Sequence, residues 1–410
     1  MNGRQRIMAA VAHQEPDKIP KDLGATPSSG ISAIAYRELL NYLGMGQTEV
    51  KIYDVVQQLA QVDDAILDCY GIDVVDVGRN FAAAQDWKPF TPPGFPPGTS
   101  TVPAWFRPQP CDGGFLVCQN GVQIARMPVG ATFFDQTIFP YADGYPKDYK
   151  GLPEAMSKVL WSALVHSPWD RAGETDFYQT LRRNALKLRE ETDRALMIVC
   201  GCNLFEWGTF LRGIDNFLCD LLLEPEEVER LLDALMELHL ATLERVCDAV
   251  GDVCDILRFG DDLGMDSGPL MQPEIYRELF KPRHTMLTDY VHRNSGMRTF
   301  LHSCGSLYKL LPDLIEAGYD IINPVQISSR DMEPERLKRE FGKDITFWGG
   351  GCDTRNILNR GSVAQVRDHV KHQIETLMPG GGFVFSAVHN IMPDCPPENI
   401  EAMFETAEAY

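Results

Sequence analysis

The stretch Arg298-Thr299-Phe300-Leu301-His302-Ser303-Cys304-Gly305 predicts a buried strand that ends in chemically active side chains. It belongs to a regular alternation of expected helices and strands that begins near residue 170. Helices are expected over 178–191, 225–250, 273–294, 307–317, 333–341 and 363–377, and strands over 195–200, 255–259, 298–302, 320–323, 344–348 and 382–386. Such alternation indicates parallel strands joined by helical crossovers.

Both a doubly wound sheet and a closed barrel produce this alternation, and two features favour the barrel. No glycine-rich phosphate loop follows the first strand, so the fingerprint of a dinucleotide-binding fold is missing. Polar residues follow nearly every strand, and a barrel gathers all such strand ends on one face. These residues are Cys200, Cys202, Asp261, Asp262, His302, Cys304, Asn323, Gln326, Cys352, Asp353, His389 and Asn390. We therefore predict an α/β fold of the (β/α)8 TIM-barrel class.

The first part of the chain predicts additions to this barrel. Helical spacing over 4–13, 34–43 and 50–67 predicts an N-terminal helical extension, and alternation over 72–77 predicts a strand. Residues 85–150 are rich in proline, glycine and aromatic residues, and Asn120-Gly121 between two apolar runs predicts a β-hairpin. We interpret 85–150 as an inserted lid within a single domain that spans 1–410.

Composition narrows the possible partners and the compartment. The formal charge of −20 argues against binding to nucleic acid or to an anionic membrane surface. No apolar run approaches the ~20 residues of a membrane span, and the first residues lack the apolar core of a secretory signal. We therefore expect a cytoplasmic protein, in which most of the eleven cysteines are small core residues. A homodimer is one assembly compatible with such a chain.

His302, Cys304 and Cys352 form a candidate metal site. His302 and Cys304 are two residues apart, a spacing that places both side chains on one side of an extended backbone. Barrel closure would bring Cys352 to them from another strand. A Cys2His set leaves zinc one free coordination position, as in catalytic sites. From the residues alone, core packing or support of other side chains is the simpler interpretation, and metal binding is the alternative.

Other residues near the expected strand ends are candidates for catalysis or substrate binding. The carboxylates Asp261 and Asp262, together with His389 and Glu206, are candidate catalytic groups, although helix capping or solvation would also explain them. Trp207 and Trp348 could line an aromatic ligand, and Asn323 and Gln326 could bind it through their amides. The pair Cys200 and Cys202 is a rival thiol site, for which a core role is the simpler interpretation.

Several motifs, taken in order, resemble the uroporphyrinogen decarboxylase superfamily. They are Arg4-Gln5-Arg6-Ile7-Met8-Ala9-Ala10, Gly260-Asp261-Asp262-Leu263-Gly264, Phe300-Leu301-His302-Ser303-Cys304-Gly305, Asn323-Pro324-Val325-Gln326, Trp348-Gly349-Gly350-Gly351-Cys352-Asp353-Thr354 and Ala387-Val388-His389-Asn390-Ile391. The resemblance covers most of the chain and is weakest over 85–150. It implies a (β/α)8 barrel with its active site at the carboxyl ends of the strands.

The superfamily holds two main chemistries, and the resemblance distinguishes between them. Decarboxylases use an arginine-rich N-terminal loop, whereas residues 20–30 of this chain contain no arginine. Zinc-dependent methyltransferases of the superfamily carry a His-x-Cys motif and a distant Cys, which fall on His302, Cys304 and Cys352. The resemblance therefore implies Zn²⁺ as cofactor and methyl transfer from a methoxylated aromatic to the cob(I)alamin of a partner corrinoid protein. Transfer from a methylcorrinoid to a thiol, or a non-catalytic corrinoid-binding barrel, are the alternatives.

Overall fold

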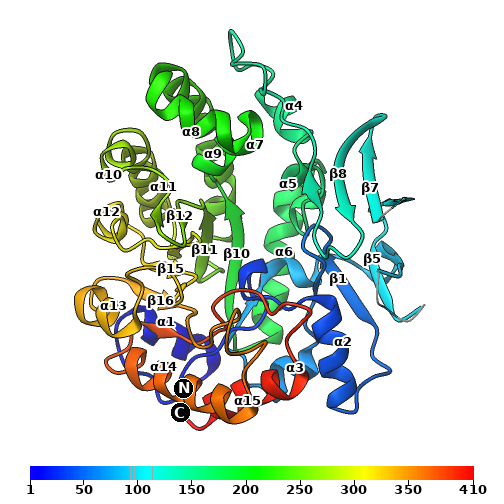
Figure 1. The fold of residues 1–410 in the computed structure, drawn as a ribbon, viewed down its shortest axis with the longest axis vertical. Coiled ribbons are helices and arrows are strands. Elements are labelled where there is room, and N and C mark those ends of the chain that lie inside the picture. The colour runs from blue at the N-terminus through cyan, green and yellow to red at the C-terminus, as the bar shows by residue number, and fades with distance from the viewer. Residues whose placement is uncertain (93–94, 96–97, 113) are drawn as a thin grey trace.

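The computed structural model describes residues 1–92, 95, 98–112 and 114–410 and is built around a curled parallel sheet (Figure 1). Within these residues the sheet has seven strands in the order β17-β16-β15-β14-β11-β10-β3, and every neighbouring pair is parallel. The strands are β3 (Val74–Asp76), β10 (Ala195–Gly201), β11 (Ile256–Gly260), β14 (Arg298–His302), β15 (Ile321–Asn323), β16 (Thr346–Trp348) and β17 (Phe383–Val384). The predicted strands are thus present, each within three residues of its expected ends.

A short N-terminal segment closes the sheet into a ring. On one side, the Phe385 N–H donates to the Pro20 carbonyl and the Asp22 N–H donates to the Phe385 carbonyl, both at 2.8 Å. On the other side, the Asp73 N–H, beside β3, donates to the Lys21 carbonyl at 2.9 Å. The segment therefore occupies the place of an eighth strand, and the predicted (β/α)8 class is confirmed.

A buried apolar cluster fills the inside of the ring. Its members are Ile7, Ala10, Val11, Ala25, Val74, Ala195, Met197, Ile256, Phe300, Ile321, Trp348 and Val384. Alternate residues of a strand point to the same face. The residues two positions after Ile256, Phe300 and Ile321 therefore also face inward, at the carboxyl ends of their strands. They are Arg258, His302 and Asn323.

Helices cover the outside of the barrel. The expected ones include α6 (Phe177–Glu191), α9 (Pro225–Val250), α12 (Leu311–Glu316), α13 (Pro334–Phe341) and α14 (Val363–Leu377), and α8 (Ile214–Leu223) and α15 (Pro397–Glu408) are present in addition. The helix expected over 273–294 is divided into α10 (Pro273–Ile275), a π-helical turn (Tyr276–Phe280) and α11 (Lys281–Asn294). The described part of the chain contains no helix with the length and apolar character needed to cross a membrane.

The N-terminal extension is only partly helical, so one expectation is wrong. Helices α1 (Gly3–Val11) and α2 (Ala33–Tyr42) are present, but residues 50–67 form β1 (Val50–Asp54), β2 (Leu59–Ala60) and the start of α3 (Asp64–Cys69). In β1, Val50, Ile52 and Asp54 are buried while the residues between them are partly exposed, which is the two-residue period of a strand. Pairing with the inserted strand β5 (Ser100–Pro103) stabilises this strand and overrides the weak helical pattern.

The insertion forms the predicted hairpin and a small sheet beside the barrel (Figure 1). Strands β7 (Gly114–Gln119) and β8 (Val122–Pro128) flank Asn120 and Gly121, whose φ angles of 51° and 79° are those of a type I′ turn. Its other strands are β4 (Trp87–Pro89), β6 (Gln109–Cys111) and β9 (Asp135–Gln136), and the insertion is followed by α4 (Leu152–Ser157) and α5 (Leu160–Ala163). Strand β5 pairs with β1, so the insertion is joined to the N-terminal extension by a shared sheet.

Candidate metal centre at the barrel mouth

His302, Cys304 and His389 bring three potential metal-ligand atoms together. These atoms all lie within 4.8 Å of one another. The Nε2 atom of His302 is 3.5 Å from the Cys304 Sγ, and the two imidazole rings have centroids 5.6 Å apart. His302 ends β14, Cys304 follows two residues later, and His389 follows β17, so the ends of two strands on the barrel rim converge. The structure thus groups two predicted metal ligands with a residue predicted to be catalytic.

Asn323 determines which nitrogen of His302 is available. Its Nδ2 donates to the Trp348 carbonyl at 3.0 Å, so its Oδ1 must face His302, where it lies 2.8 Å from Nδ1. The Nδ1 atom is therefore the protonated one, and the Nε2 lone pair points toward Cys304. Burial lowers the pKa of His302 well below its usual range, and this effect keeps the ring neutral. A neutral imidazole is the form that binds a metal.

His389 has the same arrangement with a different asparagine. Its Nδ1 lies 2.9 Å from the Oδ1 of Asn390, whose Nδ2 donates to the Gln57 Oε1 at 3.1 Å. The Nε2 atom of His389 is therefore the free nitrogen. Burial lowers the pKa of this imidazole too. Both histidines are thus oriented by an asparagine side chain that the sequence analysis did not assign to this role, although Asn390 directly follows His389.

Cys304 and Asp262 share the edge of the site. The Asp262 Oδ1 accepts the Cys304 N–H at 2.8 Å and lies 3.7 Å from the His302 Nε2. The Asp262 side chain is 38% exposed, so the site is open to solvent on this side. Burial, followed by the charge of Asp262, raises the pKa of the Cys304 thiol well above its usual range. A bound cation would stabilise the thiolate and offset that shift.

The structure does not place Cys352 in this group of ligand atoms. Gly349 and Gly350, with φ angles of 96° and 82°, turn the chain after β16, and Cys352 then forms a backbone bridge with Ala387. Its side chain is fully buried, and burial together with Asp353 and Cys395 raises the pKa of its thiol. The role of Cys352 as a zinc ligand therefore stays a prediction, which is tested below against His389.

Asp261 makes structural contacts at the start of a helix, and its catalytic role stays a prediction. Its carboxylate accepts the N–H groups of Phe205 and Glu206 at 3.0 and 2.9 Å, at the start of α7 (Phe205–Arg212), and lies 3.2 Å from the His284 Nε2. The side chain is 1% exposed, so it holds the helix N-terminus from within the protein. The neighbouring Asp262 is the member of the pair that faces the site.

The four residues proposed for substrate binding differ in what they contact. Trp348 is fully buried in the interior cluster and donates its Nε1–H to Asp22 at 2.8 Å, so its ring lies beneath the site. The Gln326 Oε1 accepts the Gly305 N–H and stabilises the turn after Cys304. Asn323 orients His302, as described above. Trp207 is partly buried and packs its ring edge-on against Phe210.

Glu206 combines a buried carboxyl group with negative neighbours. Burial, and then the charges of Asp262 and Asp261, raise the pKa of Glu206 to about 8. Its Oε2 accepts a hydrogen bond from the Asn203 amide. A carboxyl group with this pKa carries its proton at neutral pH and can donate it, as a catalytic general acid does.

Arg258 is a residue of the site that the sequence analysis did not identify. It lies on β11. Burial lowers the pKa of its guanidinium, and the nearby Glu206, Asp262 and Cys304 oppose this shift. A cationic residue inside the otherwise apolar run Ile256-Leu257-Arg258-Phe259 was the available signal. By contrast, the rival thiol pair Cys200 and Cys202 does not join the metal-ligand group; the Cys202 Sγ lies 3.9 Å from the Cys200 carbonyl.

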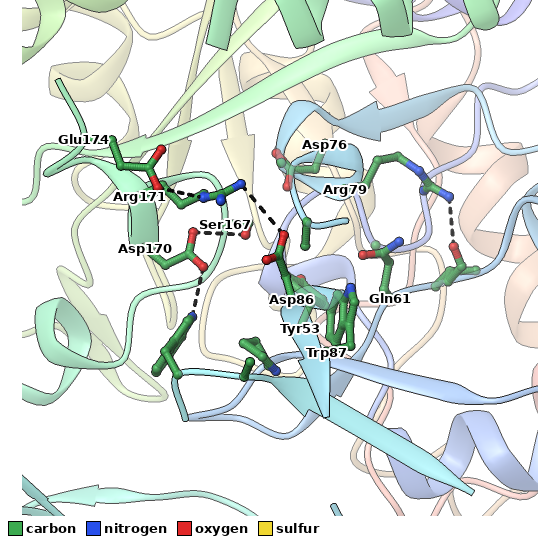
Figure 2. Close-up of a pocket in the computed structure, with 17 residues that line it drawn as sticks. Tyr53, Gln61, Asp76, Arg79, Asp86, Trp87, Ser167, Asp170, Arg171 and Glu174 are labelled. Atoms are coloured by element: carbon green, nitrogen blue, oxygen red, sulfur yellow. Dashed lines mark hydrogen bonds and ion pairs between the residues drawn. The ribbon is translucent and has the colours of Figure 1, made fainter. Parts of the chain in front are cut away.

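A separate cavity of about 290 Å³ lies between the N-terminal extension, the insertion and the segment 167–174 (Figure 2). Its wall includes the rings of Tyr53, Trp87 and Trp105. Asp76, at the carboxyl end of β3, also lines it; no residue described in the structure satisfies its Oδ1 atom, and burial raises its pKa to about 6. Burial raises the pKa of the Tyr53 hydroxyl, and the charge of Arg258, which faces the barrel interior, opposes this shift. The cavity that Tyr53 lines therefore borders the barrel interior.

Comparison with known proteins identifies the family. The model of the family described as uroporphyrinogen decarboxylase (URO-D) matches residues 201–410, about half of the chain, which includes His302, Cys304, His389 and every barrel strand from β11 onward. The protein therefore belongs to the uroporphyrinogen decarboxylase family. No curated protein matches the sequence.

Solved structures support the fold. A methyltransferase from Methanosarcina mazei superimposes with a TM-score of 0.60 at 17% sequence identity, over 100% of this chain and 99% of that chain. A B12-independent methionine synthase from Shewanella sp. W3-18-1, solved with selenomethionine, matches 55% of this chain and 65% of that chain at 12% identity and a TM-score of 0.35. The first match confirms the barrel architecture over the whole chain, and the second is too distant to support a conclusion.

Proposed function

We propose that His302, Cys304 and His389 hold a zinc ion at the barrel mouth, and this convergence of ligand atoms is the observation that carries the proposed function. The donor set fits: two neutral imidazoles and one thiol are ligand types that zinc prefers, and three protein ligands leave a position for substrate. The asparagine partners of both histidines support the fit, because metal-binding histidines commonly donate their other N–H to such an acceptor. When bound, zinc supplies a Lewis acid that polarises a substrate oxygen or sulfur.

We infer that the reaction is methyl transfer from a methoxylated aromatic to the cob(I)alamin of a partner corrinoid protein. Membership of the family, the likeness to a solved methyltransferase and the aromatic wall of the neighbouring cavity support this reaction. The methyl group passes to the reduced cobalt of the partner, and the electron pair of the broken C–O bond stays on the phenolic oxygen. Cobalt supplies the electron pair of the new bond and is formally oxidised from Co(I) to Co(III).

The protonated carboxyl group of Glu206 can supply the proton that the phenolate leaving group needs. Glu206 retains its proton at neutral pH and can deliver it to the phenolate oxygen. Asp262 holds the Cys304 backbone and keeps the turn that carries the thiol in place. Glu206 therefore protonates the leaving group, Asp262 orients the ligand Cys304, and the partner protein supplies the methyl acceptor.

Decarboxylation of a porphyrinogen is a poorer fit to this chain. The segment that closes the barrel contains one cationic side chain, Lys21, which is buried and paired with Glu408. The segment therefore offers no free cation for the several carboxylates of a porphyrinogen, in line with the absence of arginine from residues 20–30.

The proposal is tested with purified protein, zinc, free cob(I)alamin and a set of methoxybenzenes. We expect absorbance of cob(I)alamin to be replaced by that of methylcobalamin, with zinc near one equivalent per chain. Full activity of metal-free protein would contradict the zinc assignment. Supplying methylcobalamin with coenzyme M tests the thiol alternative, because that reaction regenerates cob(I)alamin. Corrinoid binding without turnover in either direction would indicate the non-catalytic alternative.

A further inference from the structure

Arg258 is a cation inside the barrel whose Nε lacks a hydrogen-bond acceptor among the described residues. It lies two residues after Ile256 of the interior cluster and faces the same side of β11, toward the barrel axis. Its Nε atom is buried, and no residue in the described ranges accepts a hydrogen bond from it. The guanidinium of Arg189 on α6, by contrast, contacts Asp255 at 2.5 Å. The unpaired Nε–H of Arg258 therefore requires an explanation.

The acidic side chains nearby act on this guanidinium without forming a hydrogen bond or ion pair with it among the described residues. The charges of Glu206 and Asp262 raise its pKa, while Glu206 accepts a hydrogen bond from the Asn203 amide and Asp262 accepts the Cys304 N–H. Leaving a buried N–H donor without an acceptor is unfavourable, and such donors are usually paired within the protein or used to bind a ligand. An anion that enters the barrel mouth would supply the missing partner.

The space around the guanidinium depends on Gly260. The Nη1 of Arg258 and the Nδ2 of Asn203 each lie 2.9 Å from the position that a Cβ would take on this glycine. A side chain at position 260 would therefore displace the guanidinium. Gly260 thus leaves room for two N–H donors, one from Arg258 on β11, the strand beside β14, and one from Asn203, which follows β10 and also donates to Glu206.

We propose that Arg258 binds a carboxylate group of the methyl donor, so that the substrate is an anionic methoxyarene such as a methoxybenzoate. This inference rests on the proposed function for its substrate but not for its binding site. A guanidinium forms paired hydrogen bonds with a carboxylate. A phosphate would share this chemistry, but its second negative charge would lie near the Asp262 carboxylate, whose charge acts on Arg258. The single charge of a carboxylate fits the surroundings better.

Equilibrium binding without any corrinoid tests the inference. The zinc-loaded protein is titrated calorimetrically with 3-methoxybenzoate, with the neutral 3-methoxybenzamide and with inorganic phosphate. We expect the benzoate to bind about tenfold or more tightly than the benzamide, which is the usual size of a charged hydrogen bond. In Arg258→Gln this preference should disappear, and in Arg258→Lys it should survive in part.

A second variant and a matched control distinguish the loss of the binding site from the loss of the fold. Gly260→Ala keeps the charge but displaces the guanidinium, so the benzoate preference should fall while the melting temperature stays near that of the wild type. Arg293→Gln removes an exposed arginine that pairs with Asp289 at 2.8 Å, and it should leave the preference unchanged. Zinc content is measured for every variant, because a loss of metal would indicate that Arg258 supports the zinc site.

The outcomes separate the two proposals. A benzoate preference that survives in Arg258→Gln, or phosphate binding tighter than benzoate, would overturn the carboxylate assignment. A preference that depends on Arg258, in a protein that never demethylates the bound methoxybenzoate with cob(I)alamin, supports the anion site and contradicts the proposed methyl transfer.

Discussion

The Nδ1 of His302 lies 2.8 Å from the Oδ1 of Asn323, and this hydrogen bond orients the imidazole for metal binding. The same oxygen also accepts the Ser28 hydroxyl at 2.8 Å, while the Asn323 amide nitrogen is held by the Trp348 carbonyl. Strands β14 and β15 and the N-terminal segment therefore together select the tautomer of one histidine. Four predictions follow from the contacts around this site.

Asn323→Ala should weaken zinc binding by about 10–100-fold, because the His302 ring loses the acceptor that holds its orientation and tautomer. Competition with a chromophoric chelator measures the affinity. Asn323→Asp keeps the acceptor and is the matched control, which should retain most of the affinity. Equal zinc affinity in Asn323→Ala and the wild type would show that the hydrogen bond has no role in metal binding.

His389→Ala should lower zinc content more than Cys352→Ser does, because only His389 lies in the group with His302 and Cys304 in this structure. Metal analysis after dialysis measures both, and Cys304→Ser serves as the reference for loss of a ligand. Cys200→Ser is the control and should leave zinc unchanged. The opposite order, with zinc lost in Cys352→Ser and kept in His389→Ala, would restore the Cys2His set expected from the sequence.

Asp261→Ala should lower the free energy of unfolding by about 3 kcal/mol, because it leaves the Phe205 and Glu206 N–H groups and His284 without their buried acceptor. Urea denaturation measures the change. Asp262→Asn, at a partly exposed position, should have a much smaller effect on stability. If Asp261→Ala unfolds like the wild type but loses activity, Asp261 has the catalytic role that the sequence suggested.

Glu206 should make the metal-free protein less stable as the pH rises toward 8. Its pKa is raised from 4.5 to about 8 in the folded protein, so folding retains a proton that the unfolded chain has already released. This stabilising contribution is complete below pH 4.5 and is lost as the pH rises through about 8. Urea titrations at several pH values should show this decline in the wild type and a weaker one in Glu206→Gln. Identical pH dependence in both would contradict the raised pKa.

The sequence predicted the elements of the barrel more accurately than those of the N-terminal extension. In the barrel, alternating helices and strands such as 225–250 and 298–302 were predicted almost to the residue, because local periodicity and parallel crossovers specify them. In the extension, Val50–Asp54 was expected to be helical, because its strand partner β5 lies about 50 residues later. A strand stabilised by such a distant partner leaves only a weak local signal.

The sequence by itself determined the barrel, the polar rim of its strand ends and the proximity of His302 to Cys304, since each depends on spacing within one strand or on the order of elements. Only the tertiary structure decided which distant side chains meet there. It placed His389 beside His302, placed Asp261 at the start of α7, and left the Nε of Arg258 without a hydrogen-bond acceptor among the described residues. The physical reason is that the direction of a side chain after a strand depends on the turn that follows. After the turn at Gly349 and Gly350, Cys352 pairs with Ala387, and its thiol is not among the ligand atoms grouped around His302.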